Sequence, residues 1–321
     1  MNNIALICDD NYCLPTAVCI QSIIDNVPST SNTLVHVCTF GLTDANQKMI
    51  LDLSCEKVKV IINRFYQKDY SHLLSQVNQK THVSTAALIK FEIANYFSEL
   101  ERILYLDSDI IIKNDISSVF ATDISQSYLA ASFEFWNFLN YRNYSFKKDY
   151  HVDFYFNSGV MLFNLDKMRS DNVSKKLWDY KINHAKTPRM DQESFNAICG
   201  PSAVHLSIKW NFNPTFASEK NIIHINNIYH EQYASLNDLL NDVYIIHYVG
   251  EKDKPWEYAT AHMREYWDAA YKKANLNLPL NQKTYISQPS VKKMIRLLSD
   301  AKKQYGVKGA FCYLTNILLR R

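Results

Sequence analysis

The chain has few glycines for its length. Among 321 residues there are six, at positions 41, 159, 200, 250, 306 and 309. The G-x-G-x-x-G loop of dinucleotide-binding proteins and the Walker P-loop both need closely spaced glycines, so neither can be assembled from these positions. A nucleotide bound by this chain must therefore be held by side chains and by loops of another kind.

Metal-binding cysteine pairs and long apolar runs are also missing. The seven cysteines are scattered and form no C-x-x-C pair, so a structural zinc site is not expected. Five of them lie in the first 60 residues, and all but Cys55 fall in predicted strands or helices, where a thiol packs as a small hydrophobic group. No apolar run reaches the length of a membrane span. The odd cysteine count, with no secretory signal, favours a reducing cytoplasm.

Charge is unevenly distributed along the chain. Residues 287–321 contain eight lysines and arginines and one aspartate, a net charge of +7, so the remainder carries −4 because the whole chain carries +3. Apolar residues in 290–321 recur at helical spacing. This segment is either a helical pair packed on the body or an amphipathic tail that binds anionic lipid. Nucleic-acid binding is not expected, because the body is acidic and shows no known nucleic-acid module.

Strand and helix patterns alternate in the first part of the chain. The expected segments, strand and helix in turn, are residues 3–8, 13–26, 33–40, 43–53, 57–63, 85–97 and 102–106. This rhythm predicts an α/β fold with a doubly wound parallel sheet, and Thr43 is a plausible N-cap. Such sheets bind ligands beyond the carboxyl ends of their strands.

The second half of the chain is less regular. We expect strands at residues 128–134, 155–165 and 243–249, and helices at 166–185 and 191–198. Residues 275–289 are rich in Asn, Pro, Gln and Ser and indicate a linker. The predicted organisation is therefore one main domain over residues 1–274, a linker over 275–289 and a basic amphipathic tail over 290–321.

Two aspartates interrupt an apolar run after the strand at 102–106. Residues i and i+2 of an extended chain face the same side, so Asp107 and Asp109 can share one divalent cation. His247, in the last predicted strand, can complete a site for Mn²⁺ or Mg²⁺ that leaves positions open for a diphosphate. The alternatives are a solvent-exposed turn for the aspartates and a core position for the histidine.

Other polar groups stand directly against apolar runs. Asp9, Asn11 and Tyr12 can bind a base and ribose, although Asp-Asn also simply forms turns. Asn157 and the run 191–193 (Asp-Gln-Glu) offer amide and carboxylate groups suited to sugar hydroxyls. Their alternative interpretation is a turn and an acidic helix N-terminus, which the helix dipole favours.

The order of these motifs resembles glycosyltransferase family 8. The likeness runs from about residue 3 to 270, through Asp-Asp-Asn-Tyr, Leu-Tyr-Leu-Asp-Ser-Asp, Phe-Asn-Ser-Gly-Val, Asp-Gln-Glu and His-Tyr-Val-Gly with Lys-Pro-Trp. Within the family, the chain is most similar to bacterial lipooligosaccharide and lipopolysaccharide galactosyl- and glucosyltransferases. The resemblance implies a single Rossmann-like GT-A domain and retaining, manganese- or magnesium-dependent transfer from UDP-galactose or UDP-glucose. The implied acceptor is a lipid-linked oligosaccharide at the inner face of the cytoplasmic membrane.

The resemblance also implies a role for individual residues. The implied metal ligands are Asp107, Asp109 and His247. The implied UDP-sugar contacts are Asp9, Asn11, Tyr12, Lys90, Asp107, Ser108, Asp109, Asn157, Ser158, Asp191, Gln192, Gly250 and Lys254. The residues placed at the reaction centre are Gln192, Asp191 and Glu193, and those placed on the acceptor side are His82, Glu134 and Thr215.

The chain departs from the family pattern at a few positions. Lys90 stands where an arginine is common, which keeps the charge but loses the bidentate fork. The spacing after Gly250 is one residue longer than expected, so Lys252 is an alternative to Lys254 as the diphosphate clamp. Arg189 stands where the galactosyltransferase has an aromatic residue near the acceptor. Because Gln192 is a neutral amide, a front-side reaction fits better than double displacement.

Two other functions remain open on sequence grounds. A phosphatase of the aspartyl-phosphate class also places Asp-x-Asp after a strand, but it would have a threonine soon after the pair and a late Gly-Asp motif. Here Ile110 and Ile111 follow the pair, and no Gly-Asp occurs. A self-glycosylating primer, or a scaffold that binds sugar nucleotides without an external acceptor, is the second alternative.

Truncation after residue 288 should separate membrane binding from catalysis. We expect loss of salt-sensitive co-sedimentation with anionic vesicles, because each basic residue near such a surface contributes about 1 kcal/mol. Transfer to a small soluble acceptor should persist, because every matched motif ends by Trp256. Insolubility or lost UDP binding would show instead that the tail is part of the core. Full-length protein that ignores anionic vesicles at low salt would refute the membrane role.

Overall fold

The computed structural model describes residues 1–30, 32–77, 85–134, 155–184, 191–250, 253–276 and 280. All of them lie in the first of two units into which the chain divides, residues 1–282 and 283–321. The predicted tail and most of the predicted linker, as well as His82, Arg189 and Lys252, lie outside the described residues. Within the described part of the chain, no helix is long and apolar enough to span a membrane.

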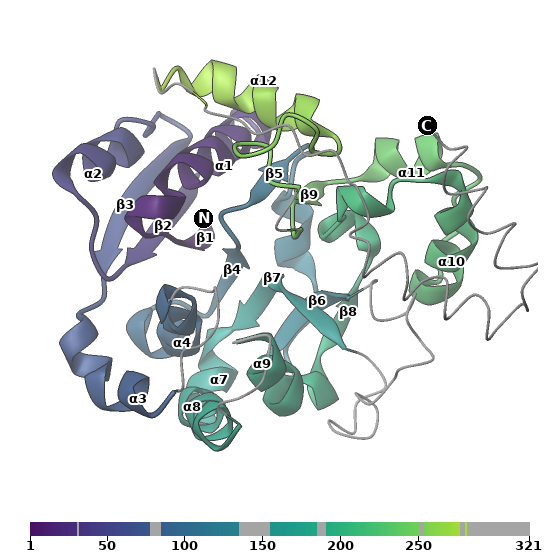
Figure 1. Cartoon of the computed structure of the whole chain (residues 1–321). Helices are drawn as coiled ribbons and strands as arrows, with labels where there is room; N and C mark the ends of the chain where they lie inside the picture. Colours follow the sequence, from purple (N-terminus) through teal and green to yellow (C-terminus); the bar gives the residue numbers. More distant parts are fainter. Residues whose placement is uncertain are drawn as a thin grey trace, which may run out of the picture. The chain divides into compact units, whose positions relative to one another are not determined.

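A central sheet of seven strands organises this unit, in the order β3-β2-β1-β4-β7-β6-β8 (Figure 1). The strands are β1 (Asn2–Ile7), β2 (Thr33–Thr39), β3 (Val58–Arg64), β4 (Arg102–Leu106), β6 (Leu129–Phe133), β7 (Phe156–Asn164) and β8 (Val204–Leu206). The pairs β3–β2, β2–β1, β1–β4 and β6–β8 are parallel. The predicted α/β class with a parallel-dominated sheet is therefore confirmed.

One strand differs from the expectation of a wholly parallel sheet. β7 runs antiparallel to both of its neighbours, β4 and β6. Every residue of β7 except the last is buried. A strand buried on both faces reads as a continuous apolar run in either direction, so the sequence pattern carries no information about its orientation.

Helices and short 3₁₀ turns cover the two faces of the sheet. The α-helices are α1 (Cys13–Asn26), α2 (Asp44–Leu51), α3 (Ser71–Gln76), α4 (Ile93–Tyr96), α7 (Leu165–Ser170), α8 (Val173–Asn183), α9 (Gln192–Cys199), α10 (Glu219–Tyr229), α11 (Leu236–Asp242) and α12 (Arg264–Ala274). The 3₁₀ turns are η1 (Asp10–Tyr12), η2 (Gln67–Tyr70), η3 (Thr85–Glu92), η4 (Ser117–Ala121), η6 (Gly200–Ser202), η7 (Ile208–Trp210) and η8 (Pro214–Phe216).

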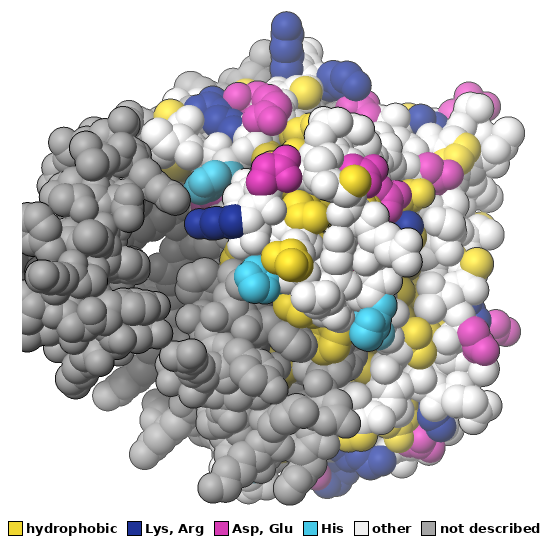
Figure 2. All heavy atoms as spheres, turned by 90° about the vertical axis from the view of Figure 1, so that its right-hand side faces the viewer, with side chains coloured by type: hydrophobic (Ala, Val, Ile, Leu, Met, Phe, Trp, Pro, Cys, Tyr) yellow, Lys and Arg dark blue, Asp and Glu magenta, His cyan; other side chains and the backbone are white. Residues whose placement is uncertain are grey.

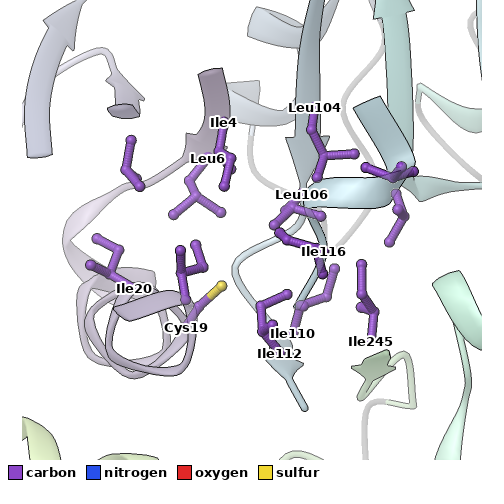
Figure 3. Packing of buried hydrophobic residues seen from close by; sticks show 14 of the residues in the cluster. Ile4, Leu6, Cys19, Ile20, Leu104, Leu106, Ile110, Ile112, Ile116 and Ile245 are labelled. Atoms are coloured by element: carbon purple, nitrogen blue, oxygen red, sulfur yellow. The ribbon is translucent and has the colours of Figure 1, made fainter. Parts of the chain in front are cut away.

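The hydrophobic core lies on both sides of the sheet because strand side chains alternate between its faces. Ile4, Leu6, Leu104 and Leu106 belong to one cluster with residues of α1 and α2, and Figure 3 shows Leu6 on the side of α1 and Leu106 on the side of Ile116. The intervening residues of the same strands pack with α4, α7, α8 and α9 in a second cluster. A third apolar cluster joins α10, α11 and α12 to a smaller sheet.

This smaller sheet determines where the last predicted strand lies. β5 (Ile110–Ile112) pairs antiparallel with β9 (Ile245–His247), and Ile110 is opposite His247. Because Ile110 directly follows Asp109, this register brings the histidine to the aspartate pair. The two segments are more than 130 residues apart in the chain.

Two expected helices are formed differently. Residues 85–97 are mostly 3₁₀ turn, η3, followed by the four-residue α4. Lys90 in η3 is buried against carboxylates from other segments of the chain. The spacing of apolar residues cannot predict such a tertiary contact. The expected helix at 166–185 is two helices, α7 and α8, separated where Asn172 adopts a left-handed conformation (φ 53°). Thr43 holds the predicted N-cap position of α2, but its hydroxyl bonds Asp10 instead of capping the helix.

Among the described residues, the surface on the side of α10 and α11 is not dominated by charge of one sign. Figure 2 shows acidic, basic and hydrophobic side chains interspersed there. The clustered charges of the described residues lie instead at the strand ends, where the aspartate pair is found.

Candidate functional site

The candidate site forms where β1 and β4 end beside each other. Ser108 donates a hydrogen bond from its hydroxyl to the carbonyl of Ile7 at 2.7 Å, which joins the two strand ends. The backbone amide of Asp107 donates to the carbonyl of Gly159 on β7 at 2.8 Å. The amide of Tyr248 donates to the carbonyl of Asp109 at 2.9 Å. The loop that carries the aspartates is therefore attached to β1, to β7 and to the residue that follows β9.

Asp107, Asp109 and His247 form a cluster that is able to hold a metal ion. One potential ligand atom from each residue lies within 4.8 Å of the others. His247 Nε2 is 3.1 Å from Asp109 Oδ1 and 3.7 Å from Asp107 Oδ2. Asp109 Oδ1 is buried and accepts no hydrogen bond from the described residues. Oxygen and imidazole ligands with open positions suit Mn²⁺ or Mg²⁺.

Two buried lysines partly neutralise the carboxylates. Lys90 Nζ lies 3.0 Å from Asp107 Oδ1 and 2.8 Å from Asp191 Oδ2. Lys254 contacts Asp109 Oδ2 and donates to the carbonyl of Tyr248 at 2.6 Å. Three carboxylates against two ammonium groups leave a net negative charge, which favours a divalent cation.

The same contacts keep these groups charged. Burial alone lowers the pKa of both lysines, but Asp107 and Asp191 around Lys90, and Asp109 beside Lys254, raise each pKa above its usual value. Burial raises the pKa of Asp109, yet the Lys254 ammonium outweighs that effect and holds the pKa far below its usual range. Lys90, Lys254 and Asp109 are therefore charged at neutral pH.

Gly159 comes closest to the cluster from β7. A Cβ atom built on it would lie 2.1 Å from His247 Cε1 and 2.8 Å from Asp107 Oδ2. No side chain fits there without displacing a potential metal ligand. The sequence motif around this residue was predicted to line the site, but the glycine itself was not assigned a role.

Amide and carboxylate groups gather beside the cluster, as predicted. Gln192 Oε1 accepts from the Ser158 amide at 3.2 Å, and Asn157 Oδ1 accepts from the Gly159 amide at 2.9 Å. Asn157 Nδ2 donates to Glu134 Oε2 at 2.9 Å, and Gln192 Nε2 lies 3.5 Å from the same oxygen. Glu134, predicted on the acceptor side, is thus a direct partner of both amides.

Asp191 and Glu193 on either side of Gln192 have different surroundings. Asp191 Oδ2 accepts from the Ser158 hydroxyl at 2.9 Å and pairs with Lys90, so it lies at the cluster. Glu193 is buried on α9, and its charge opposes the lowering of the Lys181 pKa that burial causes. Of the two acids, Asp191 is the one that the structure brings to the aspartate pair.

The predicted nucleotide loop lies next to Lys254. Asp9 Oδ1 accepts from the backbone amides of Asn11 and Tyr12 at 3.0 and 3.1 Å, which closes the η1 turn after β1. The Tyr12 ring is 39% exposed and packs edge-on against Trp256, with 6.0 Å between centroids. Lys254 lies over the same indole at 5.6 Å. An exposed aromatic face and a cation therefore adjoin the aspartate pair.

A pocket opens on the other side of the amides. It is lined by Phe133, Glu134, Asn157, Ile208, Asn211, Asn213, Phe216, Tyr229 and Val249, and its space of about 280 Å³ includes open solvent. Thr215 is exposed next to this lining, and its hydroxyl and amide bond Asn213. Gly250, the other predicted clamp residue, follows Val249 directly.

Two site residues were missed by the sequence analysis. Tyr105 donates its hydroxyl to Asp107 Oδ1 at 2.6 Å, and Asn211 Oδ1 lies 2.8 Å from His247 Nδ1. Tyr105 lies in a strand that the sequence predicts to be buried. Because a buried tyrosine hydroxyl needs a hydrogen-bond partner, a polar contact of Tyr105 could have been predicted. Asn211 lies in an irregular loop, and nothing in its local sequence indicates its partner.

This arrangement, a parallel-dominated α/β sheet with an aspartate pair at the strand ends, defines a glycosyltransferase fold of the GT-A class. The chain belongs to glycosyl transferase family 8, whose sequence profile matches residues 3–260. The family expected from the sequence motifs is confirmed.

Curated relatives share about a quarter of their residues with this chain. A lipopolysaccharide 1,3-galactosyltransferase of Salmonella typhimurium is 27% identical over 264 residues, 79% of this chain and 72% of that protein. A lipopolysaccharide 1,2-glucosyltransferase of Escherichia coli is 27% identical over 77% of this chain and 71% of that protein. A putative glycosyltransferase of Haemophilus influenzae is 27% identical over 66% of this chain, and the match spans 64% of that relative's length.

Solved structures share the fold. The galactosyltransferase LgtC, solved with donor and acceptor sugar analogs, has a TM-score of 0.68 and 22% identity, covering 86% of this chain and 97% of that one. The bifunctional glycosyltransferase WbbM has a TM-score of 0.66 and 18% identity, covering 84% of this chain and 49% of that one.

Replacing Gly159 with alanine should damage the cluster through the His247 ring. We expect G159A to lower the free energy of unfolding by about 1–3 kcal/mol, as overpacking does. Because the nearest contact is the imidazole, the same change made in a His247→Ala background should cost clearly less. Chemical denaturation of the four proteins of this double-mutant cycle measures the difference. An equal cost in both backgrounds would contradict the close approach.

Proposed function

We propose that this protein is a metal-dependent, retaining hexosyltransferase that transfers galactose or glucose from its UDP form to a lipopolysaccharide or lipooligosaccharide acceptor. The observation that carries the proposal is the group of Asp107, Asp109 and His247 at the strand ends of a family 8 glycosyltransferase. The galactosyl- and glucosyltransferase names of the relatives support the choice of sugar.

Asp107, Asp109 and His247 would hold the cation, with Mn²⁺ or Mg²⁺ as the candidates. The metal would supply positive charge that stabilises the leaving diphosphate. Lys254 contacts Asp109, one of these three residues, so its ammonium would also lie close to the diphosphate and would pair with it. Gly250 lies in the loop that leads to this lysine.

The donor would lie across the strand ends. Asp9, Asn11 and Tyr12 would bind the uridine, with the exposed Tyr12 ring as a stacking surface. Asn157, Ser158, Asp191 and Gln192 would bind the sugar hydroxyls. Lys90 bridges Asp107 and Asp191, so it connects the metal ligands to the sugar-binding group.

A front-side reaction fits the groups near Gln192. Asp191 is paired with Lys90, and Glu134 accepts from Asn157, so both nearby carboxylates are held by donors. The Gln192 oxygen itself accepts a backbone hydrogen bond, which makes an already weak nucleophile weaker. In the proposed reaction, the bond from the anomeric carbon to the leaving phosphate breaks as the acceptor oxygen approaches from the same face. The acceptor proton passes to the departing phosphate.

The acceptor sugar would enter the pocket beside Glu134 and Asn157. Aromatic side chains line this pocket, and a sugar ring presents apolar C–H faces that pack on such rings. We further propose that the basic tail holds the enzyme at the cytoplasmic face of the membrane, near a lipid-linked acceptor.

The direct test is incubation of the full chain with UDP-galactose or UDP-glucose, Mn²⁺ and a truncated lipooligosaccharide, with the product analysed by mass spectrometry and NMR. A new α-linked hexose on the acceptor would support the proposal. A β-linked product would contradict the retaining reaction. Glycan found only on the protein's own tyrosines would indicate the self-glycosylating primer instead.

Asp107→Asn should abolish transfer while leaving the fold intact. The amide keeps the shape of the carboxylate, and Lys90 retains Asp191 as its partner, so no buried cation is left unpaired. Loss of one metal ligand should cost several kcal/mol in the transition state, or about 10³-fold in kcat/KM. Asp115→Asn, a surface change near β5, is the control and should retain activity. Full wild-type activity in EDTA would refute the metal role.

Gln192→Ala should lower kcat more than it changes the KM for the UDP-sugar. The reason is that an amide dipole beside the anomeric carbon stabilises positive charge that develops only in the transition state. Steady-state kinetics with saturating acceptor measures the split between the two constants. If KM alone rises, Gln192 merely binds hydroxyl groups of the ground state.

A further inference from the structure

A chain of hydrogen bonds connects the backbone of β7 to His247. The Gly159 amide donates to Asn157 Oδ1 at 2.9 Å. Asn211 Nδ2 donates to the same oxygen at 3.0 Å, and Asn211 Oδ1 lies 2.8 Å from His247 Nδ1. Asn157 and Asn211 are each 8% exposed and His247 is 2% exposed, so little water can compete for these bonds.

The orientation of both side-chain amides follows from neighbouring groups that can only donate or only accept a hydrogen bond. A backbone N–H can only donate, so the atom of Asn157 that faces Gly159 must be the oxygen. The other end of Asn157 then carries the NH₂, which agrees with its 2.9 Å contact to the Glu134 carboxylate. Asn211 must in turn present its NH₂ to Asn157, so its oxygen faces the histidine.

This orientation determines the tautomer of His247. An amide oxygen at 2.8 Å requires a donor, so Nδ1 carries the ring proton. In the neutral ring the lone pair is then on Nε2, and it is Nε2 that faces Asp109 Oδ1 at 3.1 Å and Asp107 Oδ2 at 3.7 Å. Asp109 Oδ1 is buried and accepts no hydrogen bond of good geometry from the described residues.

We propose that Asn211 is a positioning residue of the metal site, and that with Asn157 it holds His247 in the tautomer that presents the Nε2 lone pair to a divalent cation. The proposal rests on the metal role assigned above. In this proposal Asn211 contacts neither the metal nor the sugar nucleotide. It orients His247, which is a metal ligand. Outer partners of metal-bound histidines orient the ring and set its tautomer in this way.

The tautomer is tested first in the metal-free protein. Nitrogen NMR of the His247 ring, recorded at alkaline pH so that the imidazole is neutral and assigned by comparison with His247→Gln, should show a protonated Nδ1 and an unprotonated Nε2 in the wild type. In Asn211→Ala the ring should lose this preference. A wild-type ring protonated on Nε2 alone would overturn the proposal.

Metal affinity is tested next, by Mn²⁺ titration followed by electron paramagnetic resonance. Asn211→Ala should bind Mn²⁺ about 10- to 100-fold more weakly than the wild type. Asn157→Ala should lose less, because Asn211 remains but is free to rotate its amide. The control is Asn221→Ala, which removes an asparagine of equal 8% exposure that bonds the Phe216 carbonyl instead. It should keep wild-type affinity.

The outcomes separate this inference from the proposed function. Unchanged Mn²⁺ affinity in both Asn211→Ala and Asn157→Ala would overturn the role of the hydrogen-bond chain while leaving the metal site standing. Equal losses in Asn211→Ala and Asn221→Ala would show a general effect of destabilisation and would also overturn it. A wild-type protein that binds no Mn²⁺ would refute the proposed metal role itself. If Asn211→Ala fails to fold, the wild-type NMR result and Asn157→Ala still decide the question.

Discussion

The structure depends on how the charge of two partly buried aspartates is compensated. Asp107 and Asp109 follow β4, a strand whose residues are all buried except the first, where an isolated carboxylate is costly. Lys90, Lys254 and His247 surround them, each delivered by a different segment of the chain. Lys90 pairs with both Asp107 and Asp191, and Lys254 pairs with Asp109, so the pairing constrains the sheet, η3 and the loop after β9 together. The remaining negative charge makes this arrangement able to bind a cation.

The close approach of β7 to the cluster affects both the aspartate–histidine group and the neighbouring side-chain amides. Gly159 allows β7 to approach His247, and the same segment supplies the backbone amides that orient Asn157 and Gln192. One strand therefore organises both the metal ligands and the groups proposed to bind the sugar. Its antiparallel direction presents these consecutive amides at the ends of the parallel strands, where α/β folds bind their ligands.

The sequence predicted the parts of this site that have local signals. The Asp-x-Asp pair and the polar loop after β1 follow apolar runs, the Asp-Gln pair stands at the start of α9, and the structure brings the three together. The reversed direction of β7 and the role of Asn211 were not predictable in this way. A doubly buried strand looks the same in both directions, and Asn211 acquires its role only from a partner 36 residues away. The division of residues 166–185 into two helices depends on one left-handed residue, Asn172, which apolar periodicity does not register.

Anomalous X-ray diffraction at the manganese edge, from crystals grown with Mn²⁺ and UDP, tests the central claim most directly. The account predicts one strong peak bonded to Asp107, Asp109 and His247 Nε2, with UDP oxygens completing the coordination. It also predicts the Nδ1 proton of His247 directed at Asn211. Manganese bound elsewhere, or UDP bound while the three residues remain without a metal, would contradict it.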